Sequence, residues 1–262
     1  MNQFAVNLST IFTEVPFMER FKKARECGFS IVECQFPYEY SKDEILKELE
    51  QNHLKMVLHN LPPGDWEKGD RGLAADPRRL EEFHQSVDAA IQYAKALNVT
   101  KVHCMAGIVH MVESELARKT FMTNIHYAAT QLGKHGITLL IEPINSFDIP
   151  GYFLNDLQLA VEILHEINLA NVKLQFDFYH IQRIHGDPLS LFKKHKDSIA
   201  HVQIADVPGR HEPGTGEINY RTILDHLGEC YQGDIGLEYL PLTKSEDSFE
   251  WIKMKDRGGS MR

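Results

Sequence analysis

Short apolar runs alternate with longer amphipathic stretches along most of the chain. The short runs are four to six residues long, which is the usual length of buried strands. We expect eight strands, over Phe4–Leu8, Ile31–Cys34, Lys55–Leu58, Lys101–Cys104, Thr138–Glu142, Val172–Asp177, Ile199–Ile204 and Ile235–Tyr239.

The longer stretches repeat their apolar side chains at helical spacing, and some carry helix-start signals. Ser41 followed by Glu44 forms a capping-box pattern, and Asp76-Pro77 indicates the start of a long helix. We expect the segment 178–196 to be irregular apart from one short helix. The helices are expected over Pro16–Cys27, Ser41–Asn52, Asp76–Leu97, Glu113–His135, Asn155–Ile167, Leu189–His195, Tyr220–Cys230 and Lys244–Lys255.

Strand and helix alternate roughly eight times without a break in composition, which predicts a parallel sheet closed into a barrel. The expected fold class is α/β, a single (β/α)8 TIM barrel over residues 1–256 with a flexible tail at 257–262. The alternative is a doubly wound open sheet, but no Gly-x-Gly-x-x-Gly follows any expected strand. P-loop, Gly-x-Ser-x-Gly and His-Glu-x-x-His motifs are also absent from the sequence.

The charge balance and the cysteines narrow the class of protein. A net charge of −9 and a pI of about 5.9 do not suit a nucleic-acid backbone or an anionic membrane. The four cysteines are scattered without a Cys-x-x-Cys pair, as in reduced cytosolic proteins. The N-terminal stretch resembles neither a signal peptide nor a membrane span, so we expect a cytoplasmic protein. Apolar outer helices are compatible with a homo-oligomer.

Four polar side chains end strands five to eight of the expected barrel: Glu142, Asp177, Gln203 and Glu238. The carboxyl ends of barrel strands meet at one face, so these side chains are expected to share one quadrant of it. Three facing carboxylates repel one another unless a cation neutralises them. An all-oxygen ligand set favours a hard divalent ion, Mg²⁺ or Mn²⁺, over zinc. The alternative is that each acid is a solvated strand-end residue.

Glu142 and Glu238 are expected to lie on opposite sides of this ion and to transfer protons. A substrate with a carbonyl next to a hydroxyl would lie between them, with its carbonyl polarised by the metal. One glutamate removes a proton from carbon, and a glutamate returns it to the next carbon of the enediolate. This reaction is a 1,2-isomerisation of an α-hydroxycarbonyl compound, and it needs no organic cofactor.

Three further residues are candidates for substrate binding. His180 is placed to hydrogen-bond a substrate oxygen, with a purely structural histidine as the alternative. Arg210 lies in a loop rich in Gly and Pro, where it is suited to bidentate binding of a carboxylate or to an ion pair with Glu212 or Glu217. His59 ends the third strand, and it either lines the pocket or braces a loop.

The expected loop over 59–76 is long for a compact domain, and such loops are usually functional. Its Trp66 is placed to cover the mouth of the barrel as a lid. Cys104 ends the fourth strand without a candidate base beside it in the sequence, so we interpret it as a packing residue.

Several long runs of the sequence resemble those of a known enzyme family. They are Leu58-His-Asn-Leu-Pro-Pro-Gly-Asp-Trp66, Leu140-Ile-Glu-Pro-Ile-Asn-Ser-Phe-Asp-Ile-Pro-Gly151, Gln175-Phe-Asp-Phe-Tyr-His-Ile-Gln-Arg183, and His201-Val-Gln-Ile-Ala-Asp206 with Glu212-Pro-Gly-Thr-Gly-Glu-Ile-Asn-Tyr220. With these runs the chain resembles the hydroxypyruvate isomerases, within the xylose isomerase-like barrels that include the ketose 3-epimerases. The resemblance covers nearly the whole chain.

The resemblance implies the same four metal ligands and the same pair of catalytic glutamates. It implies interconversion of hydroxypyruvate and 2-hydroxy-3-oxopropanoate, and Gln203 is typical of that branch. His180 and Arg210 resemble the substrate-binding histidine and arginine of the epimerases. Leu240 is a departure, because close relatives are expected to carry a lysine there, near the mouth of the barrel.

Other functions remain open alongside this one. A 2-oxo-tetronate isomerase and a ketose 3-epimerase would use the same site on a small hydroxy-oxo acid or a short sugar. A non-catalytic small-molecule-binding barrel belongs to a different class, and in it the three carboxylates would have no use. A DNA-repair nuclease would need metal-binding histidines and a basic groove, which the acidic charge balance opposes.

Overall fold

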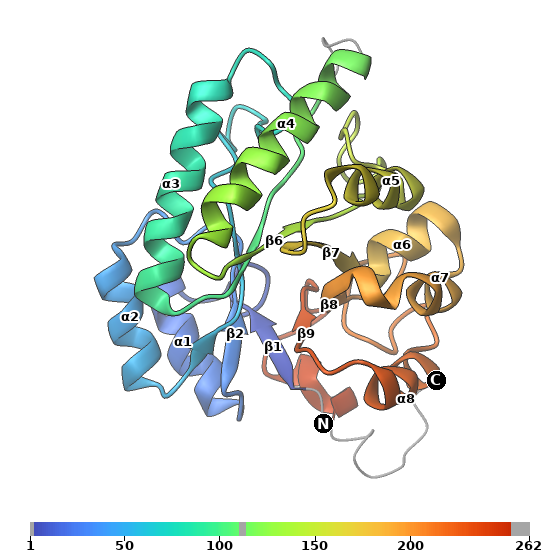
Figure 1. Ribbon diagram of the computed structural model, residues 1–262. Helices are drawn as coiled ribbons and strands as arrows, with labels where there is room; N and C mark the ends of the chain where they lie inside the picture. The colour runs from blue at the N-terminus through green and yellow to red at the C-terminus, as the bar shows by residue number, and fades with distance from the viewer. Residues whose placement is uncertain (1–2, 110–113, 253–262) are drawn as a thin grey trace.

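The computed structural model describes residues 3–109 and 114–252, which form a central ring of strands with helices on its outside (Figure 1). Neighbouring strands of the ring pair in parallel, in the order β3-β2-β1-β9-β8-β7-β6-β5-β4. This nearly closed barrel confirms the predicted fold class. The strands are β1 (Phe4–Asn7), β2 (Ile31–Glu33), β3 (Lys55–Met56), β4 (His59–Asn60), β5 (Lys101–His103), β6 (Thr138–Ile141), β7 (Val172–Asp177), β8 (Ile199–Ile204) and β9 (Ile235–Leu237).

The two edge strands of the sheet, β3 and β4, lie in and directly after the segment that the sequence predicts as the third strand. The sequence predicts one strand over Lys55–Leu58, whereas the structure has two short strands there, of which β3 pairs with β2 and β4 pairs with β5. One continuous stretch of chain therefore borders both ends of the sheet. The long loop predicted to begin at His59 begins instead at Leu61, because His59 and Asn60 belong to β4.

Helices connect most of the strands and cover the outside of the ring (Figure 1). The predicted capping box is confirmed, since Ser41 Oγ accepts from the Glu44 backbone N–H and the Glu44 carboxylate accepts from the Ser41 N–H. No helix in the described part of the chain is long and apolar enough to cross a membrane. The described helices are α1 (Phe17–Glu26), α2 (Lys42–Gln51), α3 (Leu80–Leu97), α4 (Ser114–Gly133), α5 (Leu157–Ile167), α6 (Phe178–His185), α7 (Pro188–His195) and α8 (Tyr220–Cys230), with 3-10 turns η1 (Lys196–Ser198) and η2 (Asp247–Phe249).

Two expectations about the helices are wrong, namely the start of α3 and the absence of a helix directly after β7. Asp76 does not cap α3, because it accepts hydrogen bonds from the backbone and side chain of Arg78 in a turn before the helix. The segment after β7 is helical rather than irregular. Asp177 caps α6 by accepting from the Tyr179 backbone N–H, and Gly186 ends that helix in the left-handed conformation. Asp177 therefore belongs both to the end of a strand and to the start of a helix.

The last predicted helix, Lys244–Lys255, is only partly described. It opens with a turn and the 3-10 segment η2, and residues 250–252 are helical. The rest of this helix, the predicted boundary between 256 and 257, and the predicted helix start at Glu113 lie outside the described residues.

The inner face of the ring is apolar toward one end of the strands and polar toward the other. A small apolar cluster, separate from the main core, comes from β1, β2, β6 and the two residues between β3 and β4. Side chains two residues apart face the same side of a strand, so polar side chains follow on the same inner face. Asn7 follows Ala5 in this way, and Glu142 follows Leu140. The strand pattern thus places buried polar groups at the carboxyl-terminal mouth of the barrel.

Candidate active site

A cavity of about 260 Å³ opens at the carboxyl-terminal ends of the strands. Four predicted site residues line it, and the described lining also brings in polar residues that were not predicted. Asp177 and Gln203, the other two predicted ligands, are fully buried at the ends of β7 and β8. The charged and polar lining residues are Gln35, Asn60, Arg71, His103, Glu142, Asp148, Gln175, His180, Arg210 and Glu238.

Three of the four predicted ligands carry a buried oxygen atom that has no hydrogen-bond partner in the structure. These atoms are Oε1 of Glu142, Oδ2 of Asp177 and Oε1 of Gln203. The amide of Gln203 is oriented by its nitrogen, because Nε2 donates to Glu33 Oε1 at 2.7 Å. Unpaired buried acceptors cost free energy, so three of them from adjacent strands are what a cation site provides.

Glu238 differs from the other predicted ligands because both of its oxygens are hydrogen-bonded. Oε1 accepts from Asn7 Nδ2 at 2.9 Å and from Gln35 Nε2 at 3.0 Å. Oε2 accepts from Arg210 Nη2 at 2.7 Å. Since a carboxylate oxygen accepts at two sites, Oε2 keeps one free position for a metal ion or a proton.

Burial raises the pKa values of the three carboxylates. The pKa of Glu142 lies well above its ordinary value because of burial and then because of nearby Glu238 and Asp177. Burial raises the pKa of Asp177 to about 7, against the guanidinium of Arg210, which lowers it. Burial also raises the pKa of Glu238, and Arg210 again opposes the shift. The cluster therefore favours an added proton or a cation near neutral pH.

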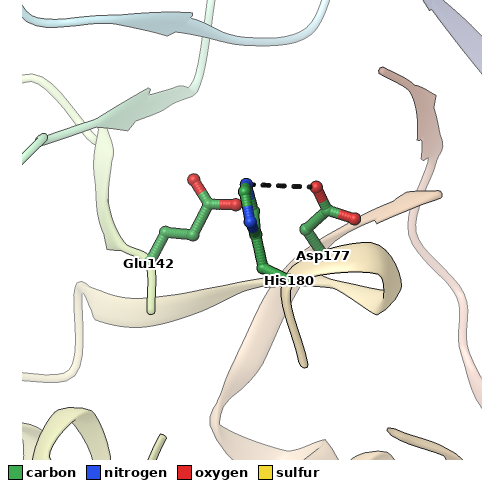
Figure 2. Close-up of side chains that lie close together, drawn as sticks. All are labelled: Glu142, Asp177 and His180. Atoms are coloured by element: carbon green, nitrogen blue, oxygen red, sulfur yellow. Dashed lines mark ion pairs between the residues drawn. The ribbon is translucent and has the colours of Figure 1, made fainter. Parts of the chain in front are cut away.

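His180 lies close to two of the carboxylates (Figure 2). One ligand atom each from Glu142, Asp177 and His180 fall within 4.8 Å of one another, and His180 Nε2 is 3.7 Å from Asp177 Oδ2. By distance alone, these three residues form a candidate metal group. Its carboxylate members match the predicted ligands, whereas His180 was predicted to bind substrate.

The hydrogen bonds around Asn145 decide which nitrogen of His180 carries the proton. Asn145 Oδ1 accepts from the backbone N–H groups of Phe147 and Asp148, so its Nδ2 is the atom that faces His180 Nδ1 at 2.7 Å. Nδ1 therefore accepts, and the neutral ring carries its proton on Nε2. Burial lowers the pKa of His180 well below its ordinary value, which keeps the ring neutral. This tautomer suits hydrogen bonding to a substrate oxygen rather than metal ligation.

The guanidinium of Arg210 interacts with two carboxylates of the site, those of Glu238 and Asp177. Its Nη2 lies 2.7 Å from Glu238 Oε2 and 3.6 Å from Asp177 Oδ2, and its guanidinium packs over the Tyr179 ring. It makes no ion pair with Glu212 or Glu217 in the described part of the chain. The positive charge is therefore shared with two predicted metal ligands instead of standing free for a substrate.

A buried carboxylate that was not predicted, Glu33, orients several of these groups. Its Oε1 accepts from Gln203 Nε2 at 2.7 Å and from Asn7 Nδ2 at 3.1 Å, and its Oε2 contacts His201 Nε2 at 2.7 Å. Asn7 in turn donates to Glu238. Burial raises the pKa of Glu33 to about 7, while the hydrogen bonds from Gln203 and Asn7 lower it. Glu33 thus links two predicted ligands without lining the cavity.

The Glu33 contacts continue toward the other end of the barrel. Lys101 Nζ lies 2.9 Å from His201 Nδ1 and 3.7 Å from Asp234 Oδ2. An ammonium group can only donate, so His201 accepts at Nδ1 and donates from Nε2 to Glu33. Gly236 leaves room for this arrangement, because a Cβ there would lie 2.5 Å from Glu33 Oε1. These polar contacts hold Glu33 in one position inside the barrel.

Other residues extend the site or support it. Gln175 Nε2 donates to Glu142 Oε2 at 2.9 Å, and His103 Nε2 lies 3.6 Å from the same oxygen. His59 does not line the cavity, and its Nδ1 is 3.1 Å from the Tyr38 hydroxyl, which supports the bracing alternative. Cys104 is buried in the main core, as its interpretation as a packing residue requires.

The residues that were not predicted also lie at or near the ends of strands, as the predicted ligands do. Asn7 and Glu33 end the first two strands as Asp177 ends β7. Gln175 and His201 stand two residues before predicted ligands, and therefore on the same face of their strands. Asn7 and Glu33 lie outside the last four expected strands, whereas Gln175 and His201 lie within them but before the residues that end the strands.

The sequence matches the model of the family described as xylose isomerase-like TIM barrel over residues 21–255. The chain belongs to this family. It is 44% identical over 254 residues to the hydroxypyruvate isomerase of Escherichia coli K12, covering 96% of this chain and 98% of that protein. It is 41% identical over 257 residues to the 2-oxo-tetronate isomerase of Cupriavidus necator, covering 97% and 98%. The family member described here is accordingly an isomerase.

A solved structure agrees with this membership. The crystal structure of a Brucella melitensis protein titled AP endonuclease, family 2, is 45% identical and superposes with a TM-score of 0.94. The match covers 97% of this chain and 98% of that one. The two proteins therefore share this fold over nearly the whole of both chains.

Proposed function

We propose that this isomerase interconverts hydroxypyruvate and 2-hydroxy-3-oxopropanoate with the help of one bound Mg²⁺ or Mn²⁺ ion. The observation that carries the proposal is the set of unpaired, buried oxygens of Glu142, Asp177 and Gln203 beside a small cavity. The name of the Escherichia coli relative supports the choice of substrate. The four free cysteines fit a reducing compartment, which supports a cytoplasmic location.

The residues present fit a hard divalent cation. Glu142, Asp177, Gln203 and Glu238 would hold it, and all four offer oxygen atoms, which Mg²⁺ and Mn²⁺ prefer. When bound, such an ion polarises a carbonyl group and stabilises negative charge on the adjacent oxygens. Burial raises the pKa values of Glu142, Asp177 and Glu238, which supports a site that gains from an added proton or cation.

The protein's own side chains would perform the proton transfers. Glu142 and Glu238 both line the cavity, and burial makes each a stronger base than an exposed glutamate. One would take the proton from the hydroxyl-bearing carbon, and the other would deliver a proton to the neighbouring carbon. His180 would donate from Nε2 to a substrate oxygen, because Asn145 occupies its Nδ1.

The other functions remain distinguishable candidates. A cavity of about 260 Å³ suits acids of three or four carbons, and relatives named 2-oxo-tetronate isomerase favour the four-carbon acid as the second candidate. A ketose 3-epimerase would need the same proton pair. A binding barrel without chemistry would show no turnover at all. A nuclease is opposed by the net charge of −9.

The first test follows the reaction in D₂O. Metal-stripped protein, with Mg²⁺ or Mn²⁺ restored, is incubated with hydroxypyruvate and followed by proton NMR. We expect the aldehyde to appear, with deuterium at the carbon that receives the proton. Turnover of 2-oxo-tetronate or a ketose in place of hydroxypyruvate would retain the site and change the substrate. No turnover of any of the three, at full metal occupancy, would favour the binding barrel.

Metal binding should strengthen as the pH rises through about 7. Burial raises the pKa of Asp177 to about 7, so below this pH a proton competes with the ion for the carboxylate. Ionisation of one group with this pKa predicts about tenfold weaker Mn²⁺ binding at about pH 6 than at about pH 8. Calorimetry in buffers of different ionisation enthalpy measures both the affinity and the protons released. An affinity that is unchanged or higher at the lower pH would contradict the prediction.

A further inference from the structure

Arg71 is a cation of the cavity wall that the predicted mechanism does not use. It lies in the loop between β4 and α3, and its guanidinium stacks on the indole of Trp66 at 3.8 Å from the ring centroid. Nη1 donates to the backbone carbonyls of Trp66 at 3.1 Å and Asp70 at 2.6 Å. The plane of the guanidinium is therefore set by the indole and by two hydrogen bonds from one nitrogen.

The other edge of this guanidinium stands free. Within residues 3–109 and 114–252, Nε and Nη2 of Arg71 have no hydrogen-bond partner, and Arg71 makes no ion pair. Arg210 differs, because its charge is shared with Glu238 and Asp177. Arg79 in the neighbouring stretch is paired with Asp70 and Glu82. Two arginines belong to the described cavity lining, Arg71 and Arg210, and of these Arg71 has no carboxylate partner.

The backbone around Arg71 is held firmly against the barrel. Gly72 has φ +107°, and a Cβ there would lie 2.3 Å from the Met105 carbonyl oxygen, so the loop touches the chain after β5 directly. Gly72 forms a bridge with Ala106, and the Ala75 N–H donates to the Ala106 carbonyl at 2.8 Å. The stacked guanidinium is consequently positioned before any ligand arrives, which lowers the entropic cost of binding.

We propose that the Nε–Nη2 edge of Arg71 is the subsite for the substrate carboxylate. These two N–H groups point the same way and match the two oxygens of a carboxylate, the bidentate geometry that arginine favours. The inference rests on the proposed function and deepens it. It names the substrate class as a short oxo acid rather than a neutral sugar, since a ketose has no group that needs this charge. Leu240, the position where a lysine was expected, is half exposed and absent from the cavity lining.

The test compares an acid with its neutral counterpart. Hydroxypyruvate carries a carboxylate where dihydroxyacetone carries a hydroxymethyl group, and the two are otherwise alike. Each is first equilibrated with a trace of wild-type protein, so that no net reaction occurs, and is then titrated by calorimetry into the Mg²⁺-loaded protein. The variants are Arg71→Met, Arg71→Lys and the control Arg78→Met, which removes an exposed arginine paired with Asp76 outside the cavity.

Arg71→Met is expected to bind hydroxypyruvate about 10- to 100-fold more weakly than wild type and Arg78→Met, as for loss of a charged hydrogen-bonded pair. Arg71→Lys should lose less affinity for hydroxypyruvate, because lysine keeps the positive charge but lacks the pair of parallel N–H donors. Dihydroxyacetone should bind all four proteins alike. Equal hydroxypyruvate affinity in Arg71→Met and Arg78→Met, equal loss for both ligands, or no binding of hydroxypyruvate to wild type would overturn the subsite.

The outcome is separable from that of the proposed function. Binding of hydroxypyruvate that depends on Arg71, without any isomerisation in the NMR experiment, would leave the carboxylate subsite in place and remove the proposed reaction. If hydroxypyruvate is isomerised but its affinity is the same with and without Arg71, the proposed reaction is supported and the carboxylate subsite is overturned.

Discussion

Replacing Glu142 or Glu238 with glutamine should lower kcat for hydroxypyruvate by about 10²- to 10⁴-fold, the usual contribution of a general acid or base. Glutamine keeps the size and the oxygen atom of glutamate but cannot accept a proton from carbon. Both side chains line the cavity, and burial raises the pKa of each. Steady-state kinetics at saturating Mg²⁺ measures the loss, and metal analysis of each variant shows how much ion it retains.

Deuterium incorporation separates the roles of the two glutamates. A variant that lacks only the residue returning the proton should still exchange the substrate C–H with D₂O, although it forms little product. A variant that lacks the base should do neither. Glu229→Gln, an exposed substitution on α8, is the control and should retain full activity. Retention of kcat within about tenfold in both active-site variants would remove the proposed proton pair.

Replacing Glu33 with glutamine should weaken Mg²⁺ or Mn²⁺ binding by about 10- to 100-fold, the usual effect of losing a group that orients a metal ligand. Glu33 is fully buried and accepts hydrogen bonds from Gln203 and Asn7, with His201 as its third contact. A glutamine presents an NH₂ group to one of these donors, so the contact becomes repulsive. The Gln203 amide then loses the hydrogen bond that fixes its orientation.

The Glu33 prediction is checked by calorimetry with Mn²⁺ and by the shift in melting temperature that Mn²⁺ produces. Substitution of Glu26, an exposed residue paired with Lys22, by glutamine provides the control. Burial disfavours a charged Glu33, which offsets part of the cost of the repulsive contact, so the metal-free variant is expected to remain folded and to melt below the wild-type temperature. A melting temperature near wild type combined with unchanged Mn²⁺ affinity would show that Glu33 does not position the site.

Much of the site was predictable because barrel geometry relates residues by their place on a strand. Polar residues at the ends of apolar strands must meet at one mouth once the barrel closes. Glu142 and Glu238 were predicted in this way, and both line one cavity. His180 and Arg210 line the same cavity but were predicted from segments that follow the strands. Glu33 was overlooked although it ends β2, because its strand is far in sequence from those of the predicted ligands.

The strand and helix pattern was predictable where local chemistry decides it. The capping box at Ser41 is local and was predicted correctly. The helix after β7 was not predicted, because Asp177 was interpreted only as the end of an apolar strand, although Asp also favours the N-cap position of a helix. The start of α3 was misplaced because the Asp76 side chain bonds to Arg78 in a turn of its own.

By itself, the sequence determined the barrel class, the family, and the residue types that end its strands, because each follows from periodicity, motif runs and local chemistry. Only the tertiary structure decided how those side chains are used. Hydrogen bonds between segments that are distant in the sequence orient the Gln203 amide, assign the proton of His180, and occupy Arg210. Packing of a loop leaves the Arg71 edge free. These choices depend on which atoms meet across the barrel, and no local pattern encodes that.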